Sequence, residues 1–179
     1  RGMAHVELNR GRITLLEGQW EVTQAHFQKS LSIFKTLNDV KGLDRTLMYL
    51  GYLTYQRSDF AGARNYFEHV KNYRENTPHL QKDALGRLFN ALGVIDFYEE
   101  KWENSLEHFQ QSLELLQTST DLESLALVHH NLGKLYLIFK ELKRSKTHIF
   151  QRDSLLHQYH FPALKKISDF NKPALILDE

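Results

Sequence analysis

The side chains best suited to chemistry in this sequence are its ten histidines, and their spacing argues against a metal site. His157 and His160 lie one helical turn apart, but the chain has no cysteine, no HExxH pattern and no third ligand at a known spacing. His129 and His130 are adjacent, so they face different sides of a helix and cannot easily share one ion. We therefore expect no metal site, and we regard His130 as a residue that could make binding pH-sensitive.

The sequence also lacks the patterns that identify an enzyme. It has no glycine-rich loop of the kind that holds phosphate, and no recognisable Ser/His/Asp set. The absence of cysteine excludes thiolate chemistry and a disulfide framework, and it fits a reducing compartment. We therefore expect a cytoplasmic protein that is not an enzyme, with no catalytic residues and no cofactor.

The composition is that of a packed helical chain of 179 residues. A hydrophobic fraction of 41% is enough for a core, and three prolines with nine glycines argue against disorder or a β-rich fold. The net charge of +1 gives no general attraction to nucleic acid or anionic membranes. No apolar run approaches the roughly 18 residues of a membrane span. The sequence begins at Arg1, inside a helical pattern, so we expect a piece of a larger protein with further sequence upstream.

Two stretches of the chain are near copies of each other. Residues 19–31 return as residues 101–113, and this offset of 82 residues divides into two steps of about 41. A weaker copy, residues 59–67, lies between them. Glycines follow the same rhythm, and we call these four the repeat glycines: Gly11, Gly51, Gly93 and Gly133. Self-similarity at this period predicts a repeat architecture, and repeat arrays mostly serve as binding surfaces.

Each repeat reads as two helices. In the third repeat, apolar residues recur at helical spacing over residues 85–97 and again over residues 106–116. Only Glu100-Lys101 remains between the two runs, which predicts a tight turn between antiparallel helices. Equivalent turns are predicted at 18–19, 58–59 and 140–141. Strand signals are absent, so the sequence predicts an all-α array of four antiparallel helix hairpins.

The repeat pattern also predicts the division of the chain. We expect a repeat domain over residues 1–160, followed by a capping helix and a tail over residues 161–179. Pro162 suits the first turn of that ninth helix, which we expect to end near Asp169. The four units of the repeat domain are predicted at about 4–40, 41–79, 80–120 and 121–160.

The repeat glycines require a steric explanation, because glycine inside a helix costs about 1 kcal/mol relative to alanine. Four of them at one phase predict that the second helix of each hairpin packs too close for a side chain. Small residues hold the matching phase in that helix: Thr23, Ala63, Ser105 and Ser145. The second helices open with Trp20, Phe60, Trp102 and Leu142, and we expect the three aromatic residues to pack between hairpins.

These features resemble the tetratricopeptide repeat over residues 4 to about 160. The best matches are Leu50-Gly51, Tyr55, Phe60, Ala63 and Phe67; Leu92-Gly93, Phe97, Trp102, Ser105 and Phe109; and Asn131-Leu132-Gly133 with Tyr136. Steps of 40 and 42 residues between glycines exceed the common form of about 34 and look like the long-helix variant. That variant occurs in kinesin light chains, spindle-orientation adaptors and bacterial regulators, including peptide-pheromone receptors. The fourth unit matches least, with Ile149 in place of an aromatic residue, which suits a cap.

The resemblance implies a right-handed superhelix that binds partners and does not catalyse reactions. In such a superhelix the first helix of each hairpin lines the concave face. The exposed positions near each repeat glycine then give a candidate ligand surface: His5, Asn9 and Arg12; Arg45, Tyr49, Tyr52 and Gln56; Arg87, Asn90 and Tyr98; and His130, Asn131 and Lys134. This set contains no carboxylate. Asparagine can bond a peptide backbone in both directions, and arginine and lysine suit acidic groups. An extended or helical peptide fits, an acidic one included.

Charge is distributed unevenly along the chain. Residues 96–123 hold eight acids against Lys101, whereas residues 134–166 hold eight bases against Glu141 and Asp153. Solvated outer faces explain this pattern, and so does docking or head-to-tail self-association through the ends.

Three functions therefore remain open for the chain. The first is a non-catalytic scaffold that binds a protein or peptide segment. The second is the peptide-sensing domain of a larger bacterial transcriptional or signalling regulator. The third is a self-associating structural scaffold, which would be a homo-oligomer. We expect no membrane partner and no nucleic-acid partner for this stretch of sequence.

Overall fold

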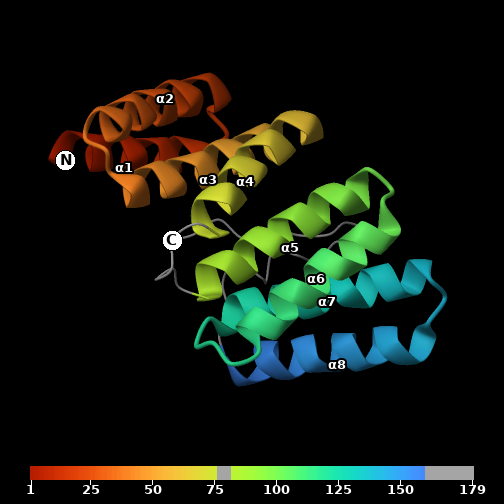
Figure 1. The fold of residues 1–179 in the computed structure, drawn as a ribbon. Coiled ribbons are helices and arrows are strands. Elements are labelled where there is room, and N and C mark those ends of the chain that lie inside the picture. Colours follow the sequence, from red (N-terminus) through yellow and green to blue (C-terminus); the bar gives the residue numbers. More distant parts are fainter. Residues whose placement is uncertain (76–81, 160–179) are drawn as a thin grey trace. The chain divides into compact units, whose positions relative to one another are not determined.

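The computed structural model describes residues 1–75 and 82–159, and every regular element in these ranges is an α-helix. The eight helices are α1 (Gly2–Leu16), α2 (Trp20–Thr36), α3 (Val40–Gln56), α4 (Phe60–Glu75), α5 (Lys82–Tyr98), α6 (Trp102–Leu116), α7 (Leu122–Ile138) and α8 (Leu142–Gln158). They pair as four antiparallel hairpins, α1–α2, α3–α4, α5–α6 and α7–α8 (Figure 1). The all-α, solenoid-like fold class predicted from the sequence is confirmed.

The hairpins group into two compact units, residues 1–78 and residues 79–179. In the first unit α2 packs on α3, and α1 also contacts α3 directly. In the second unit α6 packs on α7, and α5 contacts α7. The first helices of neighbouring hairpins are therefore neighbours within each unit. The predicted capping helix and tail, 161–179, lie outside the described residues.

The four turns inside the hairpins share one backbone geometry at the predicted places. Each contains a residue in the left-handed region: Gly18, Ser58, Glu100 and Lys140, with φ between 59° and 73°. The next amide then donates to the carbonyl five residues back, as in the bond from Lys101 N to Asp96 O at 2.9 Å. This is the hydrogen bonding of a Schellman ending, which satisfies carbonyls that the helix leaves open. Only the first turn uses glycine, so the turn tolerates polar residues at a small cost.

Aspartate side chains begin three of the helices. Asp39 Oδ1 accepts a hydrogen bond from Gly42 N at 3.0 Å, and Asp59 Oδ1 accepts one from Gly62 N at 2.9 Å. Asp121 Oδ1 likewise accepts one from Ser124 N at 3.1 Å, at the start of α7. Each bond satisfies an amide that has no partner inside the helix.

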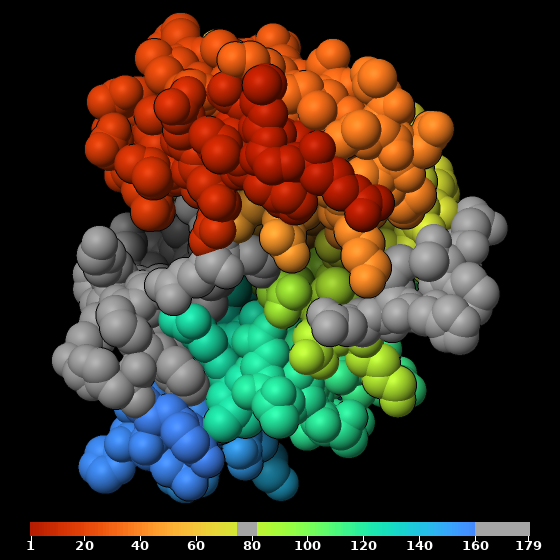
Figure 2. Space-filling view, turned by 90° about the vertical axis from the view of Figure 1, so that its left-hand side faces the viewer, coloured from red at the N-terminus to blue at the C-terminus, as the bar shows by residue number. Residues whose placement is uncertain are grey.

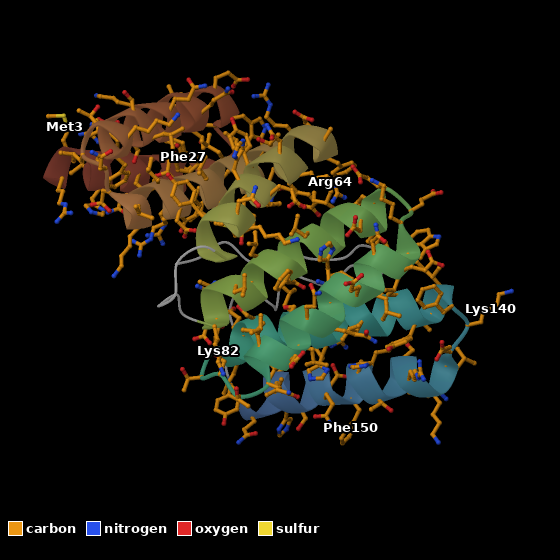
Figure 3. All side chains as sticks on the ribbon, in the orientation of Figure 1. Met3, Phe27, Arg64, Lys82, Lys140 and Phe150 are labelled. Carbon is orange, nitrogen blue, oxygen red and sulfur yellow. The ribbon has the colours of Figure 1, made fainter. Side chains whose placement is uncertain are left out.

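The repeat glycines lie where the second helix of each hairpin crosses the first, as predicted. A Cβ atom built on each would meet the side chain sixteen residues further on: Phe27, Phe67, Phe109 and Ile149. Those three phenylalanines are fully buried, and Phe27 lies between helices in Figure 3. The predicted small residues are buried too, but the atoms nearest the glycines belong to these larger side chains. The glycine is therefore a notch for a ring.

The small residues hold the helices together by a second contact. Ser105 Oγ donates to the carbonyl of Gly93 at 2.8 Å, and Ser145 Oγ donates to that of Gly133 at the same distance. A carbonyl that already accepts the helical bond has a second lone pair for this hydroxyl. The close approach at each notch thus serves a hydrogen bond as well as ring packing.

The aromatic residues that open α4 and α6 contact their own hairpin. Phe60 lies 5.9 Å from Tyr55 between ring centroids, and Trp102 lies 5.3 Å from Phe97 with its ring nearly perpendicular. Both partners lie four residues after a repeat glycine. These ring contacts therefore close the turn end of the hairpin, whereas we had predicted packing between hairpins.

A glycine-to-alanine pair tests the notch directly. A Cβ at position 93 would lie 2.6 Å from Cδ1 of the buried Phe109 ring, so Gly93→Ala forces backbone or ring movement. We expect the free energy of unfolding to fall by about 1–3 kcal/mol, and by more for Gly93→Leu. Urea denaturation followed by far-ultraviolet circular dichroism measures the loss.

The matched control is Gly133→Ala, where the nearest atom is Ile149 Cγ1 at 3.1 Å. A flexible aliphatic side chain can move by that amount, and alanine favours the helix by about 1 kcal/mol. We expect stability to stay unchanged or to rise slightly. Equal losses at positions 93 and 133 would contradict the ring-notch account.

Candidate binding surface

The predicted ligand surface is only partly accessible in the structure. Seven of its thirteen residues are exposed or half-buried: His5, Asn9, Arg12, Arg45, Gln56, Arg87 and Tyr98. The other six are buried, so the expectation that they are exposed was wrong: Tyr49, Tyr52, Asn90, His130, Asn131 and Lys134. The reason lies in how close the first helices of neighbouring hairpins are within each unit.

In the first unit, the buried tyrosines form a seam of rings between hairpins. Tyr49 stacks on Phe27 of α2 with 5.5 Å between centroids, and the guanidinium of Arg12 lies 5.6 Å from the Tyr49 ring. Tyr52 meets the rings of Tyr49 and Phe67 edge-on at 6.3 and 5.6 Å. Both tyrosines therefore join the α1–α2 hairpin to the α3–α4 hairpin, and each ring adds packing energy there.

In the second unit, the predicted asparagines bond to each other. Asn131 Nδ2 on α7 donates to Asn90 Oδ1 on α5 at 2.9 Å, and both side chains are buried. The two residues stand 41 positions apart, which is one repeat. A buried amide pair of this kind fixes the register of α5 against α7, because losing one partner would leave the other unsatisfied.

The predicted cationic residues of the second unit have intramolecular partners. Arg87 Nη1 lies 2.6 Å from Asp121 Oδ2, the carboxylate that also caps α7. The His130 Nδ1 atom lies 3.1 Å from Arg152 Nη1, and Arg152 also bonds to Asp153. These contacts join α5 to α7 and α7 to α8, so the residues are held by structure already present in the chain.

The accessible part of the predicted surface is concentrated on α1 and α3, and we call it the α1–α3 face: Asn9, Arg12, Arg45 and Gln56. It carries two guanidinium groups and no carboxylate. Asp44, the acid next to Arg45 in sequence, forms a two-point ion pair with Arg74 at 2.8 and 2.9 Å. The surface on α1 and α3 is therefore polar and basic, which suits acidic side chains or backbone carbonyls.

Three hairpins carry a histidine fifteen residues after the repeat glycine, and each histidine meets a polar partner on the first helix. His26 Nδ1 lies 2.7 Å from Glu7, and His108 Nδ1 lies 2.6 Å from Asp96. His148 Nδ1 lies 2.8 Å from Nδ1 of His129. The repeat explains these histidines structurally, as the sequence indicated.

The partners of these histidines were not predicted, although the sequence contains their signal. Glu7 and His129 lie four residues before a repeat glycine, and Asp96 lies three residues after one. All three positions share the helix face that meets the second helix. Lys29 and His26 donate hydrogen bonds to Glu7, and these bonds lower the pKa of the Glu7 carboxyl below its ordinary value.

The histidine pair of the fourth hairpin is kept neutral by its surroundings. Burial, together with the charge of neighbouring His148, lowers the pKa of His129 from 6.5 to about 4. Burial also lowers the pKa of His148, whose ring stacks on Tyr136 at 5.4 Å. At pH 7 both imidazoles are neutral, so one ring nitrogen donates to the other. Within residues 1–75 and 82–159, no three metal-binding side chains gather at one place.

Comparisons with known proteins establish the fold class. The chain matches no known family profile and no curated protein sequence. It superimposes on a solved structure titled "Crystal structure of BtubC (BKLC) from P. vanneervenii" with a TM-score of 0.75. That match covers 98% of this chain and 70% of the BtubC chain at 14% identity. The likeness shows a shared helical fold, and the tetratricopeptide family remains a prediction.

The neutral histidine pair predicts a loss of stability in acid. The folded pKa of His129, about 4, lies below the ordinary 6.5, so the unfolded chain takes up a proton first as the pH falls. Stability from this group is therefore full above about pH 7, falls between pH 6.5 and pH 4, and levels off below. We expect about 1–2 kcal/mol less stability at pH 5 than at pH 7 from this pair.

Urea denaturation at several pH values measures this slope. The double substitution His129→Phe and His148→Phe should flatten it, because neither ring then titrates. His157→Phe, at an exposed histidine, is the matched control and should leave the slope unchanged. The assignment fails if the double variant and the wild type lose stability equally between pH 7 and pH 5.

Proposed function

We propose that the chain is a non-catalytic module of the tetratricopeptide type that binds a peptide or protein segment along the first helices of its hairpins. The observation that carries the proposal is the α1–α3 face. Its four polar side chains project from two first helices that contact each other within one unit. Repeat arrays commonly bind extended segments on the side lined by one helix of every repeat.

The chemistry of the α1–α3 face favours an acidic segment. Arg12 and Arg45 can each form paired hydrogen bonds with a carboxylate, and Asn9 and Gln56 can bond backbone amides and carbonyls. Tyr49, beneath Arg12, restrains that guanidinium by a cation–π contact. A partly held arginine loses less conformational freedom on binding, which favours affinity.

Membrane insertion has no support in the helices. Within the described residues, no helix combines the length and the hydrophobicity that a bilayer crossing requires. A partner in water therefore fits the α1–α3 face, and the proposal includes a cytoplasmic setting as predicted from the composition.

Selection from a displayed library of random twelve-residue peptides tests this function on the whole chain. We expect the enriched peptides to be rich in aspartate and glutamate, and their affinity to fall as salt rises. The variant Arg12→Ala with Arg45→Ala should weaken binding by tenfold or more, because both carboxylate contacts are lost. Fluorescence polarisation of labelled selected peptides measures the affinities.

The charge-matched control is Lys143→Ala with Lys146→Ala, which removes two exposed cations from α8. This variant should bind the selected peptides like the wild type. Equal weakening in both variants would indicate a general charge effect, and retained binding by the α1–α3 variant would place the binding site elsewhere. Either result would overturn the proposed site.

A further inference from the structure

One side of α1 exposes apolar side chains that a solvated helix would not select. Their exposed fractions are 65% for Met3, 48% for Val6, 57% for Ile13 and 78% for Leu16. We call these four residues the open stripe. The helix buries its opposite side, with Ala4, Leu8 and Leu15, against its own unit. Figure 3 shows Met3 at the outer side of α1, and the first residues lie at the molecular surface in Figure 2.

The same repeat positions pack against a helix in other hairpins. Met3, Val6 and Ile13 lie eight and five residues before, and two residues after, their repeat glycine. The equivalent residues are buried in the hairpins that follow another within a unit: Leu43, Thr46 and Leu53 in α3, and Leu125, Val128 and Leu135 in α7.

Those buried positions face the helix of the preceding hairpin. Helix α3 packs on α2 and α7 packs on α6. The hydroxyl of Thr46 lies 3.4 Å from that of Ser30 on α2, which places this position at the interface between hairpins. The open stripe therefore has the composition and the register of a surface that receives a helix. In the described part of the chain, no helix covers it.

The spacing of the open stripe is symmetric about its own middle. Met3 and Leu16 are equidistant from the point between Asn9 and Arg10, and so are Val6 and Ile13. An identical helix running antiparallel about a two-fold axis at this point brings Val6 level with the partner's Ile13, and Met3 level with the partner's Leu16. A symmetric interface needs this kind of self-complementary patch.

We propose that α1 pairs antiparallel with α1 of a second copy of this chain, through the open stripe. The charges near the stripe permit this arrangement. Arg10, beside the axis, lies 3.7 Å from Glu7 of its own helix, so part of its charge is offset. At each end the arrangement brings exposed Arg1 toward Glu17 of the partner subunit, which are opposite charges. This dimer is independent of the peptide site, because it uses another side of α1.

The size of the open stripe sets the expected affinity. It extends over thirteen residue steps, or about 20 Å of helix. Four side chains on each copy bury less than a standard interface of about 1,600 Å². We therefore expect a reversible dimer that is half-formed at roughly 10–100 µM protein.

Sedimentation equilibrium over about 1–500 µM protein tests the proposal. The wild type should shift from monomer to dimer mass, and Val6→Glu with Ile13→Glu should remain monomeric to the highest concentration. Both positions are exposed, so the fold should survive, as the circular dichroism melt will show. The matched control, Leu142→Glu with Phe150→Glu, changes equally exposed apolar residues on α8 and should dimerise like the wild type.

Cross-linking tests the antiparallel register, and the absence of native cysteines makes it clean. A chain with Met3→Cys and a differently tagged chain with Leu16→Cys are mixed and treated with a bismaleimide of about 10 Å reach. The two-fold arrangement predicts cross-linked heterodimers and few homodimers, because equal positions lie about 20 Å apart along the axis. A chain that stays monomeric at 500 µM, a dimer that persists in the Val6→Glu and Ile13→Glu variant, or efficient coupling of position 3 to itself would each overturn the proposal.

Discussion

A buried side chain of each second helix lies in a notch that a glycine leaves in the first helix, and this contact sets the geometry of each hairpin. Phenylalanine fills the notch in three hairpins and isoleucine fills it in the fourth. The missing side chain lets the two backbones approach, which allows Ser105 and Ser145 to bond the glycine carbonyls. Dispersion and burial at such a close contact outweigh the cost of glycine in a helix.

The close approach inside hairpins also decides which polar residues reach solvent. First helices of neighbouring hairpins contact each other within a unit, so side chains near the glycine line the seam between them. Tyr49 and Asn131 complete that seam through a ring stack and an amide hydrogen bond. The residues left for a ligand lie farther from the seam, on the α1–α3 face. Packing and recognition thus divide one helix between its neighbouring faces.

The sequence predicts the helices and turns well because their signals are local. Apolar spacing and the repeat glycines locate the hairpins, and Glu100-Lys101 locates a turn that the structure contains. Exposure was predicted less well, because it depends on the distance between helices that are about 40 residues apart. Asn90 fits a groove by its residue type, but its partner Asn131 comes from the next repeat. The histidine partners were missed for the same reason: Glu7 and His26 meet only after the hairpin closes.

A double-mutant cycle at Gly51 and Phe67 measures the central contact most directly. A Cβ added at Gly51 would overlap the Phe67 ring, so Gly51→Ala alone should destabilise the fold. Phe67→Leu alone should also destabilise it by reducing packing. In the double variant the added methyl occupies space that the ring has vacated, so we expect the loss to be about 1 kcal/mol or more below the sum of the single losses. Strictly additive losses in urea denaturation would show that the two residues do not share a notch, and would contradict the account.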